Sequence, residues 1–169
     1  MTADARQEFG ELLERHRKLV FKVAGTYARH PEDRADIAQE IATQLWRAFP
    51  SYDAERPFTT WMYRIALNVA ISHVRGNARR MRDSIAFDVQ FHDSADTETA
   101  DPEADERARQ LRQCIARFEP LDRALILLYL EERSYREIAD VLGISETNVG
   151  TKLGRLKELI RNDFATGAT

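Results

Sequence analysis

The sequence predicts an all-α protein with two small helical domains, a three-helix N-terminal bundle and a C-terminal helix-turn-helix domain, joined by a flexible acidic linker. Apolar residues recur with helical spacing through both ends of the 169-residue chain. Residues 83–106 instead carry nine acidic and no basic side chains, and they lack a sustained apolar period. The predicted division is therefore 1–82, 83–106 and 107–169, and the length allows two small domains.

Three helices are predicted before the linker. One apolar stripe runs from Phe9 to Tyr27 and indicates a single first helix. Pro31, followed by acidic residues, is typical of a second helix start, and Pro50 ends that helix. A loop over 51–56 then leads into a third helix that is apolar around most of its perimeter.

The linker separates two mildly basic blocks, which the net charge of −3 conceals. Residues 1–82 carry 14 Lys/Arg and 10 Asp/Glu, and residues 107–169 carry 11 and 9. Either block is therefore compatible with a nucleic-acid partner, although the chain as a whole is acidic. Within the linker, residues 85–91 alternate apolar and polar side chains. A lone strand would have nothing to pair with, so extended coil is expected.

Four helices are predicted after the linker, and the last two have the spacing of a helix-turn-helix. Leu111 to Phe118 mark a fourth helix and Leu121 to Tyr129 a fifth. Ser134 and Glu137 then form a capping box, and Gly143 suits a left-handed turn. Ser145 caps a final helix whose predicted buried residues are Val149, Leu153, Leu156 and Ile160.

The final helix is expected to enter the DNA major groove with its exposed side chains toward bases and phosphates. The candidates are Thr147, Asn148, Thr151, Lys152 and Arg155. A plain helical hairpin is the alternative, but it does not account for the caps, the glycine and the buried Val149 at these offsets. Gly150 and Gly154 each cost about 1 kcal/mol in a helix. Either they allow close approach to DNA or the free helix is marginal.

The third helix carries a polar, basic seam between two apolar faces. The seam consists of Thr60, Arg64, Asn68, Arg75 and Arg79, with Ile71 among them. The aromatic residues Tyr52 and Phe58, near Arg56, lie just before or at the start of this helix and are suited to stacking on an unstacked base of single-stranded DNA. A solvated bundle edge is the simpler interpretation of the seam alone. The aromatic loop beside it favours a DNA-binding role.

The segments DIAQE (36–40), LWRAF (45–49) and RPFTTWMYRIALNVAISHVR (56–75), followed by the helix-turn-helix, resemble a bacterial RNA polymerase sigma factor of the extracytoplasmic-function (ECF) group. The resemblance covers about residues 8–80 and 108–162. It implies a factor that binds core RNA polymerase and directs it to specific promoters. It also implies, as a partner, an anti-sigma factor. The acidic linker is then either an ordinary tether or a nucleic-acid mimic in a polymerase channel.

The resemblance also implies roles for particular residues. Asp36, Gln39 and Glu40 match the surface for the β′ clamp helices of the polymerase. Residues 51–56 match the loop that captures a flipped base of the minus-ten element. Arg64, Asn68 and Arg75 match the helix that holds the melted strand and adjacent duplex. The C-terminal domain corresponds to the one that reads the minus-thirty-five element and rests on the β flap.

Other function classes have less support. The chain has one cysteine, Cys114, and four histidines without metal-ligand spacing, so neither a disulfide nor a metal site is expected. We find no catalytic constellation or cofactor motif, so we expect no cofactor and no enzymatic activity. No apolar run has the length of a membrane span, and a cytoplasmic protein is expected. A stand-alone helix-turn-helix repressor or activator remains the alternative function.

Overall fold

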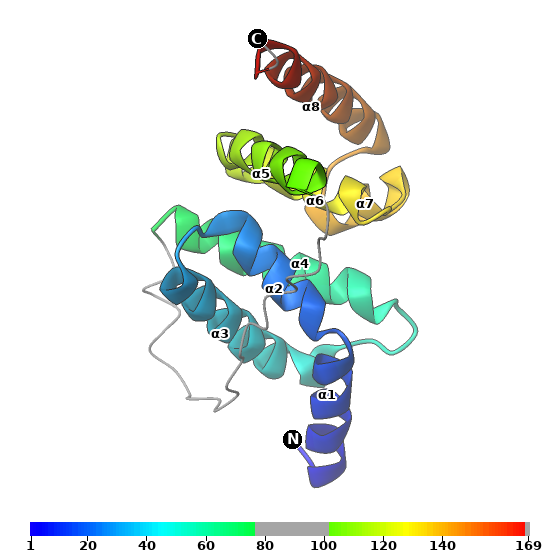
Figure 1. Ribbon diagram of the computed structural model, residues 1–169. Helices are drawn as coiled ribbons and strands as arrows, with labels where there is room; N and C mark the ends of the chain where they lie inside the picture. The colour runs from blue at the N-terminus through cyan, green and yellow to red at the C-terminus, as the bar shows by residue number, and fades with distance from the viewer. Residues whose placement is uncertain (77–101, 168–169) are drawn as a thin grey trace. The chain divides into compact units, whose positions relative to one another are not determined.

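The computed structural model describes residues 1–76 and 102–167. The chain forms two compact units, residues 1–93 and 94–169. Within the described residues all regular structure is helical, which confirms the all-α prediction (Figure 1). No helix in this part of the chain is long and apolar enough to cross a membrane. The segment 85–91, predicted as coil rather than strand, lies outside the described residues.

The N-terminal unit contains four α-helices in its described part, where the sequence predicted three. They are α1 (Ala3–Arg15), α2 (Arg17–Tyr27), α3 (Pro31–Ala48) and α4 (Phe58–Val74), and a 3-10 turn, η1 (Phe49–Ser51), follows α3. Helices α2, α3 and α4 pack on one another as the expected three-helix bundle. The additional helix is α1, which leaves the bundle at an angle to α2 (Figure 1).

The predicted single first helix is wrong because the chain breaks at His16, which has φ −108° and ψ 20°. The apolar spacing continues across the break, so the pattern carries no signal for it. The break lets α1 contact the bundle from a different direction. Phe9 of α1 makes edge-on ring contacts with Trp46 at 5.3 Å and Phe49 at 5.2 Å, measured between centroids. These ring contacts stabilise the packing of α1 on the bundle.

The core of the N-terminal unit is almost entirely apolar. Its largest fully buried side chains are Phe9, Val20, Ile37, Ile41, Leu45, Met62 and Leu67. Thr43 is a buried polar residue among them, and its hydroxyl donates to the carbonyl oxygen of Gln39 at 2.9 Å. Each large aliphatic side chain buried here stabilises the fold by roughly 1.5–3 kcal/mol. The bundle therefore holds α4 firmly on two sides.

The described C-terminal unit consists of α5 (Pro102–Ala116), α6 (Pro120–Leu130), α7 (Tyr135–Leu142) and α8 (Glu146–Gly167). Helix α5 begins inside the segment predicted as linker. Pro102 occupies its first turn together with Glu103 and Asp105. Proline and acidic residues are favoured at helix starts, so the composition that suggested a linker here belongs to a helix N-terminus.

Helices α6 and α7 both end in a left-handed residue. After α6 this residue is Glu132, with φ 60°, and the Arg133 amide donates to the Leu128 carbonyl at 3.0 Å. After α7 it is Gly143, with φ 69°. A left-handed conformation costs glycine little but strains glutamate. The turn after α6 therefore stores strain that the turn after α7 avoids.

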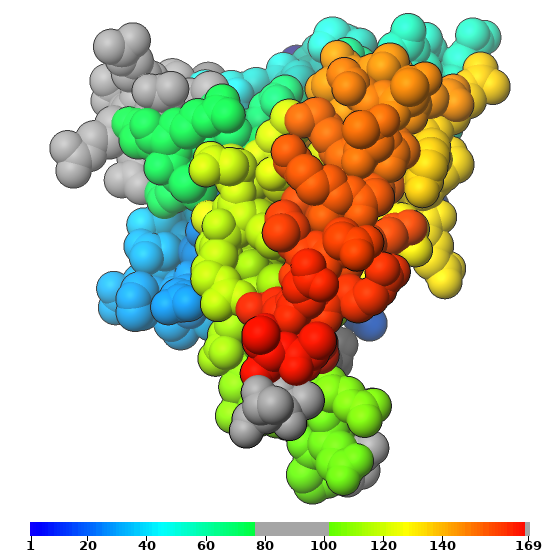
Figure 2. Space-filling model, turned by 90° about the horizontal axis from the view of Figure 1, so that it is seen from above, coloured from blue at the N-terminus to red at the C-terminus, as the bar shows by residue number. Residues whose placement is uncertain are grey.

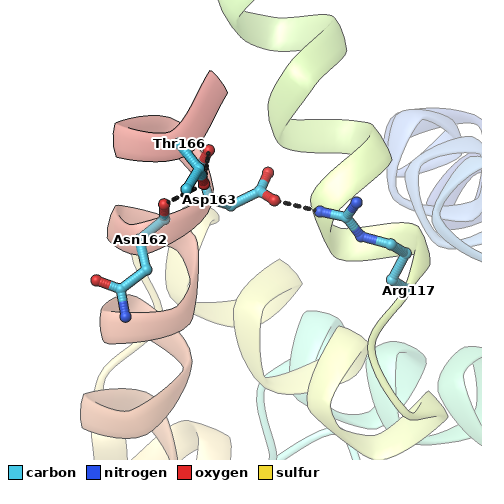
Figure 3. A network of polar contacts seen from close by, with 4 residues as sticks. All are labelled: Arg117, Asn162, Asp163 and Thr166. Carbon is cyan, nitrogen blue, oxygen red and sulfur yellow. Dashed lines mark hydrogen bonds and ion pairs between the residues drawn. The ribbon is translucent and has the colours of Figure 1, made fainter. Parts of the chain in front are cut away.

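The ends of α5 and α8 are joined by an ion pair between Arg117 and Asp163 (Figure 3). One turn beyond it, the Thr166 hydroxyl donates to the Asn162 carbonyl at 2.7 Å. Cys114 lies beside the pair and is buried, and burial is the main cause that raises the pKa of its thiol. A buried thiol with a raised pKa is a weak nucleophile, so Cys114 acts as a core residue.

Candidate nucleic-acid interface

The loop between η1 and α4 is folded onto an aromatic cluster. Its Tyr52 ring lies 4.9 Å from Trp61 and 5.4 Å from Phe58, between centroids. Phe58 also lies 5.3 Å from Trp61 and 5.2 Å from the ring of His16. Tyr52 and Phe58 were predicted to stack on an unstacked base. In the structure their rings contact each other and neighbouring rings of the same unit.

Hydrogen bonds fix the path of this loop. The Tyr52 hydroxyl donates to the Arg56 carbonyl at 2.9 Å, and the Asp53 carboxylate accepts from the Glu55 amide at 3.0 Å. Burial, followed by the negative charges of Asp53 and Glu8, raises the pKa of Tyr52. The hydroxyl therefore stays protonated and able to donate at neutral pH. Arg56 is exposed on this hydrogen-bonded loop.

The basic seam lies along the solvent side of α4. Arg64, Asn68 and Arg75 are exposed, and Thr60 is half-buried at the start of the row. Within residues 1–76 and 102–167, no ion pair involves Arg64 or Arg75. The opposite sides of α4 bury Met62, Tyr63, Ala66, Leu67, Val69 and Ala70. The helix is thus a fixed support for two cations and an amide. Arg79, expected in the same seam, lies outside the described residues.

The predicted polymerase-binding residues lie on the polar side of α3. Asp36 is exposed, and Gln39 and Glu40 are half-buried. Ile37 and Ile41, on the other side of the helix, are fully buried. The Gln44 amide donates to the Glu40 carboxylate at 3.0 Å, which orients that carboxylate along the helix surface. The three side chains therefore share one accessible face that carries negative charge.

The helix-turn-helix forms as predicted. The Ser134 hydroxyl accepts from the Glu137 amide at 3.1 Å, and the Glu137 carboxylate accepts from the Ser134 amide at 3.3 Å, so the capping box is confirmed. Gly143 takes the left-handed conformation. Ser145 caps α8 by accepting from the Asn148 amide at 3.1 Å. These local bonds set the turn between α7 and α8.

Helix α8, orange to red in Figure 2, has a broad surface open to view. The predicted DNA-reading residues lie on its outer side. Thr147, Asn148, Thr151 and Arg155 are exposed, and Lys152 is half-buried. The inner side buries Val149, Leu153 and Leu156 completely. Ile160, predicted to be buried, is half-buried because α8 extends beyond the core toward Gly167. The first three turns of α8 therefore offer hydroxyls, an amide and cations to a partner.

One of these cations has an acidic partner that the sequence did not indicate. Nitrogen Nη2 of Arg155 lies 3.3 Å from Oδ2 of Asp122 in the first turn of α6. The two residues are 33 positions apart. Their pairing depends on how α6 crosses α8, which no local pattern reveals.

The two glycines of α8 have different surroundings. A Cβ atom at Gly150 would lie 3.5 Å from the ring of Tyr135, the first residue of α7, whereas one at Gly154 would meet nothing within 4 Å. About two turns further along α8, the Lys157 ammonium lies 4.1 Å above the Tyr129 ring. A hydrogen bond with Tyr129 is the main cause that raises the pKa of Lys157. An added Cβ would therefore make ordinary contact with Tyr135 at position 150 and would lie in open space at position 154.

Comparisons with known proteins agree with this geometry. The family model of Sigma-70 region 2 matches residues 12–80, and that of Sigma-70 region 4 matches residues 108–160. The chain is 30% identical to the ECF RNA polymerase sigma-E factor of Haemophilus influenzae over 168 residues, which cover 93% of this chain and 87% of the relative.

The chain belongs to the ECF group of RNA polymerase sigma factors. This sigma factor is also 31% identical to the RNA polymerase sigma-H factor of Pseudomonas aeruginosa, over 95% of this chain and 94% of that one. The resemblance stated from the sequence is therefore confirmed, and a stand-alone repressor or activator is not favoured, since the family models match both halves of the chain.

Two solved structures share its fold. The structure of CnrH in complex with the cytosolic domain of CnrY matches with a TM-score of 0.68 at 22% identity, over 95% of this chain and 90% of that one. The sigma factor RpoE from Bartonella quintana, in complex with the anti-sigma factor NepR, matches with a TM-score of 0.70 at 15% identity, over 94% and 98%. Sigma factors are initiation factors without catalytic activity, and their domains imply core RNA polymerase and promoter DNA as partners.

Proposed function

We propose that this chain is an alternative sigma factor that binds core RNA polymerase through α3 and reads two promoter elements with its two units. The observation that carries the proposal is the presence, in one chain, of the α3 carboxylate face, the α4 seam and the capped helix-turn-helix. A repressor needs only the last of these.

The N-terminal unit would engage the polymerase and the minus-ten element. The carboxylates of Asp36 and Glu40, with Gln39 beside them, face solvent where basic groups of the β′ clamp helices can pair with them. Arg56 on the hydrogen-bonded loop, and Thr60, Arg64, Asn68 and Arg75 on α4, would hold the melted strand and the adjacent duplex. In this proposal Tyr52 and Phe58 shape the base-capturing loop through their ring contacts.

The C-terminal unit would bind the minus-thirty-five element and rest on the β flap. Thr147 and Asn148, in the first turn of α8, would face base edges. Thr151 and Lys152 follow on the next turn, where phosphates lie within reach, and the long guanidinium side chain of Arg155 would extend to a base edge. Each unit alone offers few contacts. Mounting both on one polymerase raises their effective concentration on a promoter and makes joint recognition strong.

An anti-sigma factor is proposed as a further protein partner, in the cytoplasm, where the polymerase is found. The support is the fold shared with CnrH and with Bartonella quintana RpoE, whose structures are complexes with CnrY and with NepR.

In vitro transcription tests the proposed function. The purified chain is combined with bacterial core RNA polymerase and a library of random promoter fragments. We expect the chain to migrate with the polymerase in gel filtration and to yield transcripts that start downstream of two shared sequence elements. Core polymerase alone is the control. A chain that binds a DNA duplex tightly by itself, yet neither joins the polymerase nor supports transcripts, would refute the proposal.

The polymerase contact has its own test. Asp36→Arg combined with Glu40→Arg should abolish co-migration with core polymerase, because it reverses the charge of the α3 face. The matched control is Glu11→Arg with Glu14→Arg, which makes the same charge change on the exposed side of α1. Circular dichroism checks that both variants fold. Equal polymerase binding by the two double variants would exclude this face.

A further inference from the structure

Asp122 of α6 forms an ion pair with Arg155, which lies on the exposed side of α8. The two side chains differ in exposure: 14% for Asp122 and 59% for Arg155. A largely covered carboxylate therefore holds one nitrogen of a guanidinium that is otherwise open to solvent. A guanidinium has five N–H donors in a fixed plane, so most of its donors remain available for DNA.

The pair restricts a side chain that would otherwise move freely. Ordering a long side chain when DNA binds weakens binding by about two- to tenfold. Asp122 is fixed in the first turn of α6, where Pro120 begins the helix, so it selects an Arg155 rotamer before DNA arrives. Part of the ordering is then complete in the free protein.

The Asp122 carboxylate also lowers the affinity for DNA of any sequence, which opposes the gain from ordering Arg155. A negative charge near a DNA interface weakens attraction to every phosphate backbone, whatever the base sequence. Loss of this charge should therefore strengthen binding to random DNA. A residue that pre-orients a reading side chain and repels DNA in general improves discrimination more than affinity.

We propose that Asp122 is a positioning residue that orients Arg155 for readout of the upstream promoter element and so raises the preference for the cognate duplex over random duplex. This inference rests on the proposed function, in which α8 reads that element. Asp122 itself need not touch DNA. Its effect passes through the guanidinium of Arg155.

The test uses the full chain bound to core RNA polymerase. The probe is an upstream duplex that the wild-type holoenzyme selects from a randomised pool, and the reference is a scrambled duplex of equal length. Asp122→Asn should lower the ratio of the two affinities by about two- to tenfold, while affinity for the scrambled duplex stays equal or rises. In an Arg155→Ala background, Asp122→Asn should leave the ratio unchanged. Asp122→Glu, which keeps the charge, should restore part of the ratio.

The control is Asp140→Asn, which removes an exposed carboxylate from α7 in the same unit and should leave the ratio unchanged. The proposal is overturned if Asp122→Asn leaves the ratio unchanged, lowers both affinities equally, or acts as strongly without Arg155. These outcomes leave the sigma-factor function intact. If the wild-type holoenzyme selects no duplex, the proposed function itself fails, and the role of Asp122 fails with it.

Discussion

Replacing Tyr52 by phenylalanine separates two roles that this residue could have at the promoter. The change keeps the ring and its contacts with Phe58 and Trp61 but removes the hydroxyl that donates to the Arg56 carbonyl at 2.9 Å. A net intramolecular hydrogen bond contributes about 0.5–1.5 kcal/mol. Tyr52 is half-buried, so the lower part of that range, about 0.5–1 kcal/mol, is expected.

Urea unfolding followed by tryptophan fluorescence measures this loss. Both tryptophans, Trp46 and Trp61, lie in the N-terminal unit, so the signal reports on that unit. With a slope of about 1 kcal/mol per molar urea, the midpoint of Tyr52→Phe should fall by about 0.5–1 M. Tyr129→Phe, in the other unit, is the control and should leave this transition unchanged.

Promoter opening then shows what the hydroxyl does for function. If the Tyr52 ring stacks on a base, Tyr52→Phe should open promoters normally, because the ring face remains. If the hydroxyl holds the loop in shape, opening by the holoenzyme should weaken by about two- to fivefold. Permanganate reactivity of unpaired thymines measures it. A variant with wild-type midpoint and wild-type opening would refute the role assigned to the hydroxyl.

The remaining predictions concern helix ends and the seam. Glu132→Gly should stabilise the C-terminal unit by about 0.5–1 kcal/mol, because glycine relieves the left-handed strain at φ 60°. A higher urea midpoint by circular dichroism checks it, and a lower one would contradict it. Gly143→Ala, where the added Cβ meets nothing within 4 Å, should destabilise the same unit by about 1 kcal/mol through the backbone alone. An unchanged midpoint would mean that the turn relaxes. Asn68→Ala should impair promoter opening more than binding to upstream duplex, and equal losses in the two assays would remove it from the melted-strand surface.

The sequence correctly predicts those parts of the fold that depend on residues close together in the chain. The capping box of Ser134 and Glu137 and the left-handed Gly143 depend on residues within one or two turns of each other. The break at His16 has no such signal, because helical apolar spacing continues through it. The start of α5 was missed for another reason: acidic residues mark both linkers and helix N-termini, and Pro102 decides between them only in context.

In the candidate site too, the sequence predicts what local spacing determines and misses what tertiary packing determines. Helical periodicity predicts that Arg64 and Asn68 are exposed on α4, since exposure follows from the positions of their apolar neighbours. It does not predict the pairing of Arg155 with Asp122, which comes from the crossing of two helices. Nor does it predict that the Tyr52 ring packs against its own unit, because residue type specifies an aromatic face but not its direction.

Each compact unit buries its own set of large apolar side chains, and the chain between Gly76 and Pro102 joins them. A recombination point placed in that stretch would interrupt none of the helices described in either half. Genes for related factors that exchange halves at such a point would keep every described helix together with the helices it packs against. Under the proposed function, such chimaeras would reassort the preferences for the two promoter elements, in evolution or in the hands of an engineer.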